Sequence, residues 1–197
     1  MDQYALYRDI AGRCDGDIYI GVVGPVRTGK SSFIRRFMEL MVLPGIESGG
    51  NLDRMRDELP QSGDGRMVMT NQIRFVPNEA VTLALPDSGS ARVRLVDCVG
   101  YMVDGALGAD ENGEARMVSA PWSDRPIPFD EAAETGTRRV IEDHSTIGVV
   151  VTTDGSILDL PRDAYARAEA RTIAELKQLG KPFAVLLNST HPQAGST

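Results

Sequence analysis

The chain has 197 residues, with 21 Lys and Arg against 28 Asp and Glu, so its net charge is −7. This length predicts about one domain, large enough to bury a core without disulfides, and the two cysteines, Cys14 and Cys98, cannot form a disulfide framework. The composition, 42% hydrophobic and 25% charged, excludes disordered, collagen-like and small secreted proteins.

The charge and the hydropathy pattern exclude two further classes. An acidic chain has no broad basic face with which to displace counterions from nucleic acid, so we expect no nucleic-acid partner. No run approaches the roughly 18 apolar residues of a transmembrane segment, and the N-terminus lacks the pattern of a signal peptide. We therefore expect a cytoplasmic protein.

The N-terminal half predicts alternating helices and strands. In chain order we expect a helix over 4–11, a strand over 17–24, an amphipathic helix over 30–43, a long loop over 45–65 with a helical turn at 52–58, strands over 73–76 and 81–85, and a strand over 92–97. Pro44 ends the second helix, and Pro77-Asn78 separates the two middle strands.

The C-terminal half continues the alternation. We expect an irregular stretch over 100–128, a helix over 129–144, a buried strand over 147–152, a helix over 162–179 capped by Gly180, and a strand over 183–187. This order predicts an α/β domain over residues 1–191, with a mostly parallel central sheet between two helical layers, followed by a disordered tail over 192–197. Because the chain stops almost directly after a strand, we expect it to be truncated at the C-terminus.

One segment matches the phosphate-loop pattern G-x-x-x-x-G-K-[ST] in full. It lies between a predicted strand and a predicted helix, which is where this motif binds phosphate through backbone N–H groups and a helix N-terminus. We expect Lys30 to reach the β- and γ-phosphates and Ser31 to bind Mg²⁺. The expected nucleotide contacts are Gly24, Pro25, Val26, Arg27, Thr28, Gly29, Lys30, Ser31 and Ser32. The fold expected from this motif is a three-layer P-loop NTPase of the Ras-like type.

Two further positions complete the expected catalytic set. Asp97 ends a predicted strand in a D-x-x-G pattern, where a carboxylate holds Mg²⁺ through water and Gly100 donates its N–H to the γ-phosphate. Thr70 follows the first long loop, where a threonine can bind Mg²⁺ and sense the γ-phosphate. We expect Lys30, Thr70 and Asp97 to be catalytic, and Ser31, Thr70 and Asp97 to be the metal ligands.

The base-reading position departs from that of guanine-specific proteins. Their last strand ends in N-K-x-D, whereas this one ends in Asn188-Ser189-Thr190-His191, so Asn188 is retained but the lysine and the aspartate are absent. ATP with Mg²⁺ is therefore favoured over GTP. Tyr101 stands where many GTPases have a glutamine that orients the attacking water, which predicts slow intrinsic turnover.

Blocks along nearly the whole chain resemble one family, stage IV sporulation protein A, a spore-coat ATPase of endospore-forming bacteria. The similar blocks are Gly16 to Tyr19, Gly21 to Gly24, Phe37 to Leu40, Asp57 to Ser62, Arg94 to Tyr101, Pro126 to Phe129, Glu131 to Glu134, and His144 to Gly155 (HSTIGVVVTTDG). The family has a threonine directly after Thr70, where this chain has Asn71.

The resemblance implies an ATPase whose hydrolysis drives polymerisation into the basement layer of the coat, in the mother cell at the outer surface of the forespore. It also implies partners, namely other coat proteins and a small amphipathic peptide at the membrane surface. The family is longer, and its middle and C-terminal domains are absent from this chain, so self-association can depend on those regions. Two alternatives stay open: a GTP-binding switch, and a structural protein that nucleotide stabilises without hydrolysis.

Overall fold

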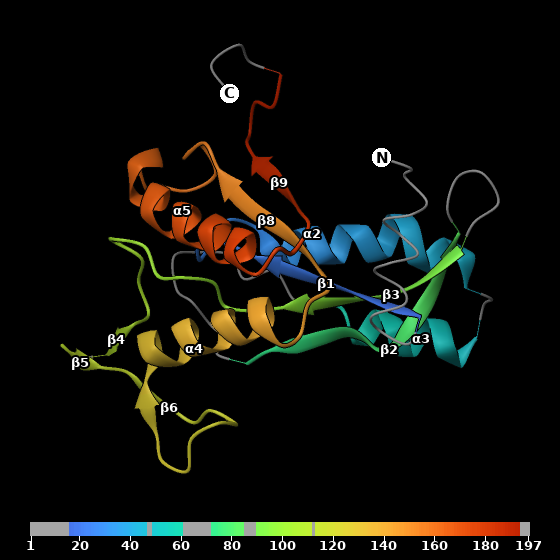
Figure 1. The fold of residues 1–197 in the computed structure, drawn as a ribbon, viewed down its shortest axis with the longest axis horizontal. Coiled ribbons are helices and arrows are strands. Elements are labelled where there is room, and N and C mark those ends of the chain that lie inside the picture. Colours follow the sequence, from blue (N-terminus) through green and yellow to red (C-terminus); the bar gives the residue numbers. More distant parts are fainter. Residues whose placement is uncertain (1–15, 47–48, 61–71, 85–89, 112, 194–197) are drawn as a thin grey trace.

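The computed structural model describes residues 16–46, 49–60, 72–84, 90–111 and 113–193 (Figure 1). Its strands are β1 (Asp17–Val23), β2 (Arg74–Ala84), β3 (Ser90–Asp97), β4 (Asp110–Glu111), β5 (Glu114–Ala115), β6 (Met117–Val118), β7 (Ile127–Pro128), β8 (Ile147–Thr153) and β9 (Phe183–Asn188). Its α-helices are α2 (Lys30–Phe37), α3 (Gly50–Asp57), α4 (Phe129–Glu142) and α5 (Arg162–Gln178). The helix predicted over 4–11 lies outside the described residues, as do residues 194–197 of the predicted tail.

The central sheet has five strands in the order β2-β3-β1-β8-β9. β1 pairs in parallel with β3 and β8, β8 pairs in parallel with β9, and only β2 is antiparallel to its neighbour. The register places Val22 beside Asp97 and Thr153 beside Asn188. The carboxyl ends of β1, β3, β8 and β9 therefore meet at one edge, where α/β sheets usually bind ligands. The prediction of a mostly parallel central sheet is confirmed.

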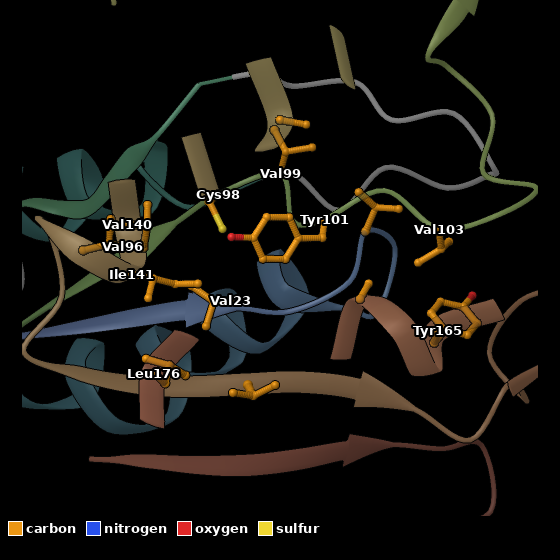
Figure 2. Packing of buried hydrophobic residues seen from close by; sticks show 14 of the residues in the cluster. Val23, Val96, Cys98, Val99, Tyr101, Val103, Val140, Ile141, Tyr165 and Leu176 are labelled. Atoms are coloured by element: carbon orange, nitrogen blue, oxygen red, sulfur yellow. The ribbon is translucent and has the colours of Figure 1, made fainter. Parts of the chain in front are cut away.

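Helices cover both faces of this sheet (Figure 1). On one face, α4 and α5 enclose a core cluster that includes Val23, Val96, Tyr101, Phe129 and Leu176 (Figure 2). On the other face, α2 and α3 enclose a second cluster built on side chains such as Ile34, Met38, Met55, Val22 and Leu95. Side chains that alternate along each strand belong to one cluster or the other, so the strands are packed on both faces.

The helix predicted over 30–43 changes its geometry part-way. It is α-helical to Phe37, continues as a π-helical turn η1 (Met38–Val42), and ends in a 3-10 turn η2 (Leu43–Gly45). In a regular α-helix, residues spaced four apart do not stay on one face, because a turn has only 3.6 residues. The wider π-helical turn has more residues per turn, so it keeps a four-residue repeat facing the sheet. Ile34, Met38 and Val42 all stay buried, whereas Met41 is 52% exposed.

Two other predicted segments differ from the structure. The strands predicted over 73–76 and 81–85 form one strand, β2, because the chain crosses Pro77-Asn78 through an irregularity in its pairing with β3 between Val76 and Val81. The stretch predicted as irregular over 100–128 contains two short antiparallel pairs, β4-β5 and β6-β7. No helix in the described part of the chain is long and apolar enough to cross a membrane.

Candidate functional site

The phosphate-loop segment leaves β1 and opens α2 at the carboxyl edge of the sheet. Its backbone has positive φ at Gly24 (126°), Arg27 (63°) and Gly29 (94°). A Cβ at Gly24 would lie 2.4 Å from the Val151 carbonyl oxygen, so only glycine fits there. No side chain caps the N-terminus of α2 and its first turn holds no acidic residue, which leaves backbone N–H groups available to an anion.

Lys30, the first residue of α2, is buried against this loop. Its ammonium donates to the Pro25 carbonyl at 2.5 Å, and the Thr28 hydroxyl donates to the same oxygen at 3.0 Å. Burial lowers the pKa of Lys30, and the opposing influence of Cys98 and Asp97 is smaller. An anionic phosphate beside the ammonium would favour its charged form, so the site suits a polyphosphate.

Ser31 and Asp97 meet, as expected, although they are far apart in the sequence. The Ser31 hydroxyl donates to Asp97 Oδ2 at 2.8 Å, while the buried Asp97 Oδ1 has no hydrogen-bond partner among the described residues. Burial raises the pKa of Asp97, and the Ser31 hydrogen bond and the charge of Lys30 oppose that rise. An orphaned carboxylate oxygen beside a hydroxyl fits a hard divalent cation such as Mg²⁺.

No cluster of three or more His, Cys, Asp or Glu that could hold a metal occurs within the described ranges. Mg²⁺ that binds beside nucleotides takes most of its ligands from substrate phosphates and waters. Ser31 and Asp97 are the described residues that could hold such an ion. Thr70, the third predicted ligand, and Asn71 lie outside the described residues.

Gly100 lies against the phosphate loop, but its N–H points elsewhere. A Cβ at Gly100 would lie 2.4 Å from Lys30 Nζ and 2.5 Å from the Gly24 carbonyl oxygen, and its φ is 100°. The N–H that we expected to donate to a γ-phosphate donates instead to the buried Thr137 Oγ1 at 3.1 Å. Thr137 is on α4, and nothing in the local sequence pointed to it.

Tyr101 is held by α5 and belongs to the core (Figure 2). Its hydroxyl donates to Glu175 Oε2, and the Arg171 guanidinium lies 4.1 Å above its ring. Burial and Glu175 raise the pKa of Tyr101 far above its ordinary range. Its backbone accepts from Val26 N–H at 2.9 Å and donates to the Gly24 carbonyl at 3.2 Å. The Val26 N–H, expected to contact nucleotide, is therefore already paired.

Asn188 joins the last strand to the phosphate loop. Its Nδ2 donates to the Thr28 carbonyl at 3.0 Å, and a Cβ at Gly29 would lie 2.5 Å from that nitrogen. The next residue, Ser189, donates to Asp154 Oδ2 at 2.6 Å. Hydrogen bonds from Ser156 and Ser189 lower the pKa of Asp154 to about 2, so this carboxylate is charged at neutral pH.

Asp154 was not among the predicted site residues. It directly follows β8, as Asp97 ends β3, and a search for carboxylates at the ends of parallel strands would have found it. Two expected contacts lie at the margin of the loop: Arg27 is half-buried, and Ser32 is exposed on the first turn of α2.

Comparison with known proteins assigns the family. The sequence model of "Stage IV sporulation protein A, ATPase domain" matches residues 1–197. This chain belongs to the stage IV sporulation protein A family. Proteins of that name are 55% identical in Clostridioides difficile (strain 630), 53% in Bacillus anthracis and 54% in Bacillus subtilis (strain 168), each over 192 residues. Each alignment covers 98% of this chain but 39% of the relative, so the chain spans about two-fifths of the length of these stage IV sporulation proteins.

Proposed function

We propose that this chain is a Mg²⁺-dependent ATPase that serves spore-coat assembly. The observation that carries the proposal is the 2.8 Å contact between Ser31 Oγ and Asp97 Oδ2, with the buried Lys30 beside them. Two motifs separated by 66 residues converge on one edge of the sheet, as a phosphate-loop and an acidic strand end do in nucleotide hydrolases. The strand order β2-β3-β1-β8-β9, with the loop after β1, supports a Ras-like P-loop fold.

The described residues of the candidate site have separate roles in this proposal. The backbone N–H groups at the start of α2 bind the phosphates, and Lys30 neutralises charge that develops on them. Ser31 and Asp97 would hold Mg²⁺, which would supply positive charge that offsets the negative charge of the phosphates. The Tyr101 side chain is engaged by α5, so we assign the orientation of the attacking water to another group, Thr70 or a residue of a neighbouring subunit.

The residues expected to contact the base favour adenine over guanine. Asn188 braces the phosphate loop, and the segment after it lacks the lysine and the aspartate with which guanine-specific proteins recognise their base. His191 stands at the position of that aspartate, and Ser189, at the position of the lysine, is hydrogen-bonded to Asp154. We therefore propose ATP as the substrate.

The cellular role follows from the family. Hydrolysis drives self-association into the basement layer of the coat around the forespore, in the mother-cell cytoplasm, together with other coat proteins and a small amphipathic membrane-surface peptide. The regions of the relatives beyond these 197 residues contribute to self-association and partner binding. Sedimentation of this chain and of a full-length relative with ATP, with ADP and without nucleotide tests this role, and polymer formation that is independent of ATP contradicts it.

The first experiment measures phosphate release from ATP and from GTP, with Mg²⁺ or with EDTA, by this chain and by Lys30→Ala. We expect Mg²⁺-dependent release from ATP that falls at least about 100-fold in the variant, because charge stabilisation at the phosphates is lost. Lys177→Ala, which removes an exposed lysine from α5, is the matched control and should retain activity.

Other outcomes separate the alternatives. A clear preference for GTP identifies a GTP-binding switch and contradicts the base assignment. Tight binding of ATP without release by either this chain or the full-length protein identifies a structural protein that nucleotide only stabilises.

A further inference from the structure

We propose that Thr137 is a positioning residue for ATP hydrolysis: it holds the Gly100 N–H when no γ-phosphate is present and yields that N–H to the γ-phosphate when ATP binds. This inference rests on the proposed ATPase function. It assigns a role to a buried hydroxyl on α4 that lies outside every nucleotide motif of the sequence.

The hydrogen bond itself is the first observation. Gly100 N–H donates to Thr137 Oγ1 at 3.1 Å, and Thr137 is fully buried in the middle of α4. Gly100 also lies in contact distance of Lys30 Nζ, the group that we assign to the phosphates. A backbone donor beside the phosphate-binding lysine is therefore paired with a side chain of the protein.

The local backbone permits that donor to change partner. Gly100 has φ of 100°, and its lack of a Cβ leaves open conformations that other residues do not adopt. The chain is anchored three residues before Gly100, where Asp97 accepts from Ser31, and directly after it, where Tyr101 makes backbone hydrogen bonds with Gly24 and Val26. Rotation of the peptide between Val99 and Gly100 can thus redirect one N–H without displacing the strand or the loop.

Thr137 connects this peptide to the helical layer. On the same helix, Glu134 accepts from Arg171 of α5 at 2.7 Å, and Arg171 also contacts Glu175 at 3.0 Å. Glu175 in turn accepts from the Tyr101 hydroxyl. The Gly100–Thr137 hydrogen bond therefore ties the nucleotide edge of the sheet to the paired helices α4 and α5, and ATP binding would release that tie.

The test compares the affinities of Thr137→Val and Thr137→Ser for ADP and for a non-hydrolysable ATP analogue, each with Mg²⁺. Valine keeps the shape of threonine but removes the Oγ1 acceptor of the Gly100 N–H, and this loss matters only when the γ-phosphate is absent. We expect the ratio of ATP-analogue to ADP affinity to rise about fivefold to tenfold in Thr137→Val, and to stay within about twofold of wild type in Thr137→Ser. An unchanged ratio in Thr137→Val, or equal shifts in both variants, overturns the proposal.

A second measurement uses the wild-type protein, so it tests the proposal even if the Thr137→Val variant does not fold. The amide NMR signal of Gly100 and the methyl signal of Thr137 should both move between the ADP-bound and analogue-bound states. The amide of Gly180, at the end of α5, serves as the control and should stay in place. Signals of Gly100 and Thr137 that are the same in both states overturn the proposal.

The two hypotheses fail in different ways. If the wild-type chain binds neither ADP nor the ATP analogue, the proposed function itself is wrong. If it binds both nucleotides and Thr137→Val leaves their affinity ratio unchanged, only the role of Thr137 is wrong.

Discussion

Asp97 and Lys30 are buried ionisable residues whose environments both favour the neutral form. Burial raises the pKa of Asp97 and lowers the pKa of Lys30. Such shifts cost folding free energy near neutral pH, where the unfolded chain would carry both charges at no penalty. Phosphates beside Lys30 and a cation beside Asp97 would offset that cost, because each ligand has the charge opposite to that of the residue it contacts.

The first prediction concerns the pH dependence of stability. The folded protein keeps a proton on Asp97 at pH values where the unfolded chain has lost it, so the free energy of unfolding falls as pH rises from 3.8 to the raised pKa. Relative to Asp97→Asn, which cannot titrate there, wild type should lose stability over this interval with a slope of at most about 1.4 kcal/mol per pH unit.

Urea unfolding of both proteins without nucleotide, at a series of pH values, measures this difference. Addition of Mg²⁺ and ADP should weaken the pH dependence, because a bound cation favours ionised Asp97. If the free energies of unfolding of the two nucleotide-free proteins change with pH in the same way, the raised pKa assigned to Asp97 is wrong.

At the scale of elements, the loop between α5 and β9 stabilises a helix far from it in sequence. The Lys181 ammonium donates to the carbonyls of Ile141, Glu142 and Ser145 at 2.5, 2.7 and 2.7 Å. The first two of these carbonyls belong to the last turn of α4, which otherwise exposes unpaired acceptors and the negative end of the helix dipole. The predicted cap at Gly180, with φ of 63°, is confirmed, and it delivers Lys181 to this place.

The second prediction is that Lys181→Met lowers the free energy of unfolding by about 1–2 kcal/mol, since the apolar stem is kept but the cap is lost. Lys177→Met, at an exposed position on α5, should change it by no more than about 0.5 kcal/mol. Denaturant unfolding of the three proteins at neutral pH measures both values. Equal losses in the two variants would show that the Lys181 contacts contribute nothing specific.

At the scale of the whole molecule, the candidate site is assembled from the ends of strands that span most of the sheet. β1 continues into the phosphate loop, β3 ends in Asp97, and β9 ends in Asn188, which bonds the loop at Thr28. A ligand bound there should therefore stabilise strands that are remote from one another in sequence.

The third prediction is that a non-hydrolysable ATP analogue, at about 100 times its dissociation constant, raises the free energy of unfolding by about 2.7 kcal/mol. Hydrogen exchange should slow in β3 and in β9 together, because the proposal places the phosphates beside Asp97 of β3 and the base beside Asn188 of β9. Protection confined to the phosphate loop would contradict the placement of the base beside Asn188. Lys30→Ala should lose the effect at the same analogue concentration.

The sequence by itself determined the turns, caps and strands that depend on residues adjacent in the chain. The pattern from Gly24 to Ser31 specifies a turn with glycine at two of its positive-φ positions, followed by a helix start, and the apolar run over 147–152 predicts a strand buried on both faces. The turn chemistry at Gly180 likewise depends on a few adjacent residues. These features were predicted because local sterics and hydrophobic periodicity decide them.

Only the tertiary structure decided which distant groups meet. The contacts of Ser31 with Asp97 and of Asn188 with Thr28 were anticipated only as convergence at one edge of the sheet, whereas Gly100 with Thr137 was not anticipated. The π-helical turn after Phe37 also escaped prediction, because packing on the sheet rather than helix propensity sets it. Hydrogen bonds between residues far apart in sequence depend on strand register and helix docking, which no local pattern encodes.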